Sequence, residues 1–288
     1  MSGLFKSILI PIDFGANTEV AVKQAVELAC LHGSIIHLLH VIKPKTTWNK
    51  LFCQIVPHRE EDYSSENVLI KLQQWGQSIE ETLPNSRVNI YVREGDIRTE
   101  IRNASREIEP QLIIIGKNRR HKYFTSFKPI CSNALAKSTG YAVLTVVRKS
   151  MNTKIKIIVV PVGSFIPIRK IELVIELARK YRAAIHLVTI PNEVDFTETR
   201  RNSFLETYRI LKSGLTSPIE HHILKGKNLP KAILEYAECI GADLILVNPD
   251  SETKISNLTG KHINDVLTTS SKLKILSIEP YRVNQLSA

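Results

Sequence analysis

The sequence predicts two α/β domains of the same type, each built on a parallel sheet with flanking helices. Two observations support this prediction. Short apolar strands alternate with amphipathic helices along the chain, and the pattern of the first half returns in the second. The chain has 288 residues, of which 43% are hydrophobic and 23% are charged, so it has enough apolar sequence for two separate cores.

Each repeat is expected to open with a buried strand that contains a proline, followed by a helix and a second strand. The opening strands cover residues 7–13 and 156–163. The helices are expected because apolar residues recur at i, i+3, i+4 and i+7, the spacing of a half-buried helix. These apolar residues are Val22, Ala25, Val26 and Ala29 in the first repeat, and Ile171, Val174, Ile175 and Ala178 in the second. The second strands cover residues 35–41 and 184–190, and Gly33 is placed to end the first helix.

The middle of each repeat is expected to hold another helix and another strand. Glycine-containing loops at 94–96 and 225–227 each precede an amphipathic pattern. Runs of branched apolar residues follow at 112–115 and 244–247. Such runs are typical of parallel strands that are covered on both faces.

Each repeat closes with a polar loop, a helix and a last strand. The last strands are expected at 142–147 and 274–278. We therefore predict a first domain at 1–148 and a second at 154–282. Between its second and third strands the first domain has a longer insert, at about 43–87.

Charge and composition exclude several classes of function. The formal net charge is +11, and the excess is spread over both halves apart from one basic loop at 117–128. No helix-turn-helix, RNA-binding aromatic strand or zinc module is visible, so nucleic-acid binding is not expected. No apolar run reaches the roughly 18 residues of a membrane span, so we expect a cytoplasmic protein without a membrane partner. The cysteines form no CxxC pair and are expected to be buried thiols: Cys30, Cys53, Cys131 and Cys239.

The order of these features resembles a tandem universal stress protein, in which two such domains are fused. The matching points are the strand-Pro-x-Asp opening, the Gly95 loop and the strand that ends at Gly116. The resemblance implies two adenine-nucleotide α-hydrolase-like domains, each a five-stranded parallel sheet flanked by helices. It also implies that the domains pair as a pseudo-dimer through their last strands, and that the protein has a stress-response or regulatory role.

Both repeats depart from the phosphate loop of nucleotide-binding members, which has the pattern G-x2-G-x9-G-[S/T]. Its glycines let backbone N–H groups approach phosphate oxygens. In the first repeat Gly116 begins the pattern, but Arg119 takes the second glycine position and Pro129-Ile130 the final pair. In the second repeat the first two glycine positions are Asn248 and Ser251. A proline has no N–H and isoleucine has no hydroxyl, so both phosphate loops are degenerate.

Three hypotheses about function follow. The leading one is a non-enzymatic regulatory protein without tight ATP binding, whose partners are its own paired domains, a homo-oligomer or an unknown protein. The alternative is an ATP-binding or adenine-nucleotide-binding protein, with slow ATPase activity as an option, that uses the first domain. The resemblance and the basic loop then imply these contacts: Asp13, Val41, Gly116, Lys117, Arg119 and Arg120. The third is an adaptor for another small molecule or an acidic partner, anchored by Trp48 and Trp75 of the insert.

The histidines indicate neither a catalytic nor a metal site. His37 and His40 lie three residues apart on one strand and point to opposite faces. His186 repeats His37 by position, which favours a role in the fold. His221 and His222 have no Glu or Cys at ligand spacing in the sequence. We therefore expect no catalytic residue, no bound metal ion and no tightly bound cofactor.

Overall fold

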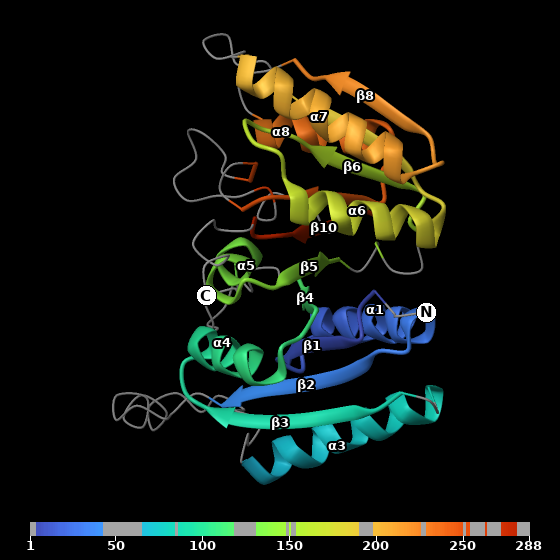
Figure 1. The fold of residues 1–288 in the computed structure, drawn as a ribbon. Coiled ribbons are helices and arrows are strands. Elements are labelled where there is room, and N and C mark those ends of the chain that lie inside the picture. Colours follow the sequence, from blue (N-terminus) through green and yellow to red (C-terminus); the bar gives the residue numbers. More distant parts are fainter. Residues whose placement is uncertain are drawn as a thin grey trace. The chain divides into compact units, whose positions relative to one another are not determined.

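The computed structural model describes residues 4–42, 65–83, 86–117, 131–147, 150, 154–189, 198–225, 229–249, 252–253, 263 and 272–280 (Figure 1). The chain divides into two compact units, Met1–Ile115 and Gly116–Ala288, and each is described by itself. Among the described helices, none combines the length and the apolar sequence that a membrane span needs.

Unit 1 is a parallel sheet with the strand order β3-β2-β1-β4. Its strands are β1 (Ser7–Ile12), β2 (Ile35–Ile42), β3 (Val88–Glu94) and β4 (Leu112–Gly116), which ends at the unit boundary. Its helices are α1 (Ala16–His32), α3 (Ser65–Thr82) and α4 (Ile97–Ile108). Each strand pairing is parallel. The middle of β1 is fully buried, at Ile8, Leu9 and Ile10, as expected for a strand covered on both faces.

Local sequence explains where the helices of unit 1 begin and end. Helix α1 ends at Gly33, whose φ of 66° is left-handed and whose N–H donates to the Ala29 carbonyl at 2.8 Å. Helix α4 begins after Asp96, whose carboxylate accepts the Thr99 N–H at 3.0 Å. Helix α3 packs closely on the sheet through Gly76, where an added Cβ would lie 3.2 Å from Ile90 of β3.

Unit 2 has the strand order β5-β10-β9-β6-β7-β8. Its strands are β5 (Ala142–Val146), β6 (Ile157–Pro161), β7 (Ala184–Thr189), β8 (Ile219–Ile223), β9 (Leu244–Val247) and β10 (Lys274–Ser277). Its helices are α5 (Ser132–Thr139), α6 (Ile168–Tyr181), α7 (Glu198–Gly214) and α8 (Leu229–Cys239). The order β8-β7-β6-β9 repeats the order of unit 1, and β10 extends it by a parallel pairing. These last five strands form the expected five-stranded parallel arrangement.

The two last strands pair with each other inside unit 2. Strand β5 runs antiparallel to β10, with Thr145 opposite Ile275. A buried hydrogen bond of 2.7 Å from the Ser277 hydroxyl to the Asn133 side chain supports this contact between α5 and β10. The predicted pairing of these strands is confirmed. Because β5 joins unit 2, the units divide at a different place from the predicted repeats, whose boundaries stay a prediction.

Two features differ from what the sequence indicated. The predicted insert at 43–87 contains helix α3, and the second repeat has a helix at the same place, α7, so this helix belongs to the repeat. The expectation of buried thiols is wrong for Cys30 and Cys239, which are exposed, while Cys131 is half-buried. Cys53 lies outside the described residues.

Candidate functional site

Asp13 lies directly after β1, at the carboxyl end of the sheet of unit 1. Its Oδ1 accepts the Gly15 N–H at 2.9 Å and also the Thr18 hydroxyl. Its own N–H donates to the Thr18 hydroxyl oxygen at 3.2 Å. The residue is exposed, so these bonds hold a carboxylate in a fixed place beside solvent. Ligands of parallel α/β sheets bind at this edge.

An aromatic cluster covers the same edge. Phe14 has a left-handed φ of 56°, and its ring centroid lies 5.0 Å from that of His40 and 5.7 Å from that of Trp75. The Lys71 ammonium lies 5.7 Å from the Phe14 ring centroid. His40 donates from Nδ1 to the Ile12 carbonyl at 2.8 Å. Burial lowers the pKa of His40, against the opposing effects of that bond and of Asp13.

This cluster bears on the adaptor hypothesis. Trp75 is half-buried and packs edge-on against Phe14 of its own unit. Trp75 therefore contributes packing within its own unit. Trp48 lies outside the described residues, so the pair of anchors stays a prediction.

The other predicted nucleotide contacts are only partly described. Val41 is buried at the end of β2, and Gly116 is half-buried at the end of β4. The Lys117 N–H, the first after Gly116, donates to the Val146 carbonyl at 2.9 Å. This donor is therefore used by the fold and does not point to a phosphate. Arg119 and Arg120 lie outside the described residues.

The corresponding edge of the second repeat contains a buried ion pair. Lys170 of α6 is fully buried, and its Nζ lies 2.8 Å from both oxygens of Glu252. It also donates to the Pro161 carbonyl, at the end of β6, at 2.6 Å. Three oxygens thus receive the three hydrogens of one ammonium. Burial lowers the pKa of Lys170 and raises that of Glu252, and their mutual attraction opposes both shifts.

The Glu252 carboxylate also engages the degenerate phosphate loop. Its Oε2 accepts the backbone N–H of Asn248 at 2.7 Å. Asn248 is the residue at the first glycine position of the loop pattern, where a nucleotide-binding chain offers its backbone to phosphate. The backbone N–H of Asn248 therefore donates to a carboxylate of the chain itself, and Lys170 neutralises the charge of that carboxylate.

Sequence reasoning missed this pair, although α6 contains a signal for it. Lys170, Val174 and Leu177 follow the spacing of one helix face, and all three are buried. A lysine on the apolar face of a helix predicts a buried partner, because an unpaired buried charge is very costly. Which acidic residue would meet it could not be read from spacing, since Glu252 is 82 positions away.

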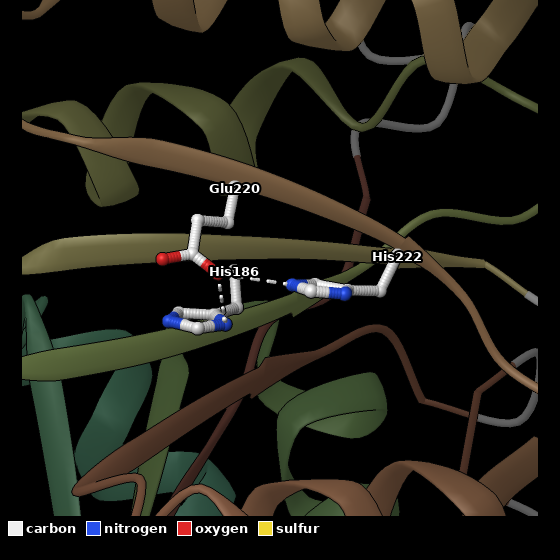
Figure 2. A group of neighbouring side chains, drawn as sticks. All are labelled: His186, Glu220 and His222. Carbon is white, nitrogen blue, oxygen red and sulfur yellow. Dashed lines mark hydrogen bonds and ion pairs between the residues drawn. The ribbon is translucent and has the colours of Figure 1, made fainter.

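A second cluster lies on β7 and β8. His186, Glu220 and His222 point toward one another from these two strands (Figure 2). His222 Nε2 lies 3.2 Å from Glu220 Oε2, and His186 Nδ1 lies 3.8 Å from the same oxygen. The expectation that His222 has no acidic residue at ligand distance is therefore wrong. Glu220 and His222 are two residues apart on β8, so this pair could have been found in the sequence, whereas His186 joins it from β7.

Comparison with known proteins identifies a family match for the first half of the chain. Residues 4–144 match the Universal stress protein family. The first repeat belongs to the universal stress protein family. Among curated proteins, none matches this chain.

Solved structures of universal stress proteins resemble the whole chain. The one from Archaeoglobus fulgidus DSM 4304 has a TM-score of 0.68 and 15% identity, covering 96% of this chain and 97% of that chain. A putative universal stress protein from Pseudomonas aeruginosa UCBPP-PA14 has a TM-score of 0.58 and 16% identity, covering 96% and 94%. The cytoplasmic domain of a prokaryotic cation chloride cotransporter has a TM-score of 0.51 and 10% identity, covering 95% of each chain. At these identities the likeness shows the fold alone.

Proposed function

We propose that this universal stress protein is a cytoplasmic, non-enzymatic regulatory protein that does not bind ATP tightly. Membership of the family supports a role in the stress response. The observation that supports the rest is the buried Lys170–Glu252 pair, which occupies the backbone donor of Asn248 and closes the second repeat to phosphate. An ATP triphosphate brings several negative charges, and binding it there would require breaking a buried ion pair.

The first repeat supports the same proposal by a different route. Lys117 gives its N–H to Val146, and Asp13 uses one carboxylate oxygen to hold Gly15 and Thr18. The pairing of β5 with β10 supports a pseudo-dimer formed within one chain. Such a protein acts by contact with a partner protein, or with further copies of itself, rather than by turnover of a substrate.

One observation favours the alternative of nucleotide binding through the first repeat. The Asp13 carboxylate is exposed at the carboxyl end of β1, where a nucleoside would meet it in binding members of the family. The basic residues Lys117, Arg119 and Arg120 follow β4 in the sequence and offer charge in place of the lost glycines. The alternative therefore makes Asp13 the decisive residue.

Two experiments test the proposal. The first identifies the small molecules that are released when the freshly purified protein is denatured, and the second titrates the protein with Mg-ATP in a calorimeter. We expect no stoichiometric adenine nucleotide and no saturable binding by millimolar ATP. Submicromolar affinity in either repeat would overturn the proposal. If ATP binds, the Asp13→Ala variant tests whether the first repeat binds it through Asp13. Glu19→Gln is the control, because Glu19 is an exposed acidic residue on the adjoining helix. Loss of binding in Asp13→Ala alone would establish the alternative.

A further inference from the structure

The register of β7 and β8 brings two imidazoles and a carboxylate onto one face of the sheet. The strands are parallel neighbours, and His186 lies directly opposite Glu220. His222 is two residues beyond Glu220, so its side chain points to the same face. Figure 2 shows the three polar ends converging on a common point from two strands. The two imidazole rings are nearly parallel, with an interplanar angle of 9° and centroids 5.5 Å apart.

The distances within this group are those of a set of metal ligands. Bonds of about 2.0–2.1 Å in a tetrahedral zinc site place the ligand atoms roughly 3.4 Å apart. Here the two nitrogens lie 3.2 Å and 3.8 Å from Glu220 Oε2, and all three ligand atoms lie within 4.8 Å of one another. Small side-chain rotations are enough to bring three such atoms to bonding distance of one ion.

We propose that His186 Nδ1, Glu220 Oε2 and His222 Nε2 bind one divalent transition-metal ion of the zinc type. Two imidazoles with one carboxylate suit this class of ion, and hard cations such as Mg²⁺ prefer sites made of oxygen alone. The side chains of Glu220 and His222 are 58% and 38% exposed, so an ion can enter from solvent and keep a water as its fourth ligand.

The surroundings of His186 agree with this role. Its Nδ1 lies 2.8 Å from the Tyr236 hydroxyl of α8, which orients the ring. Burial and the nearby Glu220 raise the pKa of Tyr236 to about 12, so this hydroxyl stays a hydrogen-bond donor. On metal binding the hydroxyl would give up its hydrogen bond to Nδ1.

The first repeat provides an internal comparison. His37 takes the place of His186, but the residue opposite it on β3 is Asn89 and the residue two positions beyond is Tyr91. These two side chains lie 3.4 Å and 3.3 Å from His37 Nδ1. A neutral amide and a phenol are poor ligands for zinc. The same architecture therefore predicts one ion per chain, held by the second repeat.

Calorimetric titration of the metal-stripped, full-length protein with Zn²⁺ at neutral pH tests this inference. We expect one ion per chain, and we expect His222→Ala and Glu220→Gln each to weaken binding by at least about 100-fold, because each removes a ligand. His221→Ala is the matched control. His221 is the neighbour on β8 and points to the other face, where its ring packs against Tyr208 with centroids 5.6 Å apart. This control should bind Zn²⁺ like the unaltered protein.

A second readout separates binding at this group from adsorption elsewhere. Co²⁺ in a tetrahedral site with nitrogen ligands absorbs visible light far more strongly than octahedral Co²⁺ in water, and we expect this strong absorption in the unaltered protein and in His221→Ala only. Zn²⁺ should also raise the unfolding temperature of these two proteins and not of His222→Ala. Absence of saturable Zn²⁺ binding, or equal affinity in His222→Ala and His221→Ala, would overturn the proposal. Neither result depends on whether ATP binds.

Discussion

At the scale of single residues, Lys170 neutralises the carboxylate that contacts the degenerate loop of the second repeat. Its ammonium is fully buried and meets the Pro161 carbonyl and both oxygens of Glu252. One side chain thus connects the end of β6 with the loop after β9. Asn248 stands at the first glycine position of the loop pattern, and its backbone N–H donates to the Glu252 carboxylate. This donor therefore already has a partner within the chain.

We predict that Lys170→Ala lowers the free energy of unfolding by about 3–5 kcal/mol, because it leaves the Glu252 carboxylate buried without a counter-charge. Urea denaturation followed by circular dichroism measures the change. Lys180→Ala is the control, since Lys180 is exposed on the same helix and its loss should cost no more than about 0.5 kcal/mol.

A double variant shows whether the charge itself is responsible. Lys170→Met combined with Glu252→Gln removes both charges and should recover part of the stability lost in Lys170→Ala. A cost for Lys170→Ala no larger than that for Lys180→Ala would mean that the pair does not form in solution. The structural argument for a closed second repeat would then fail as well.

At the scale of elements, α4 depends on its N-cap residue, Asp96. Asp96 accepts hydrogen bonds from the Thr99 N–H and hydroxyl, both at 3.0 Å, and satisfies a donor that the helix leaves unpaired. Asp96→Ala should lower the free energy of unfolding by about 1 kcal/mol, and Asp96→Asn should keep most of it. Denaturant titration of the three proteins checks this order. Equal loss in both variants would show that the cap contributes nothing specific.

The contribution of this cap should depend on pH. The Thr99 N–H lowers the pKa of Asp96 below its usual value of 3.8. A depressed pKa in the folded state means that the stabilisation is fully present above the unfolded value and is lost as the pH falls through the folded one. The difference between the unaltered protein and Asp96→Ala should therefore be constant near neutral pH and shrink below about pH 4.

At the scale of the whole molecule, the antiparallel pairing of β5 with β10 joins the last strands of the two repeats. All residues of β5 and β10 are buried, whereas β8 is the last strand in the order and has no buried residue. We predict that amides of 143–146 and 274–277 exchange with deuterium more slowly than those of 219–223, because buried, paired backbone must open before it exchanges. Mass spectrometry of peptides from the intact protein measures this. Exchange of 143–146 as fast as that of 219–223 would argue against the pairing in solution.

Much of this architecture follows from local sequence. The spacing of Ala25 and Ala29 predicts α1, Gly33 predicts its end, and the apolar run from Leu112 predicts a buried strand, all as found. These features need only neighbouring residues, since hydrophobic periodicity and capping are local properties. The repeat is visible for the same reason, because the same local patterns occur twice in the same order.

The chemistry of the sites was decided by contacts between distant residues. By itself the sequence determined the fold class, the doubled pattern and the degenerate phosphate loops. Only the tertiary structure paired Lys170 with Glu252 and brought His186 to Glu220 and His222. The physical reason is that strand register and buried charge pairing are set by how elements pack. No spacing along a single strand or helix shows that Lys170 meets Glu252 or that His186 meets Glu220.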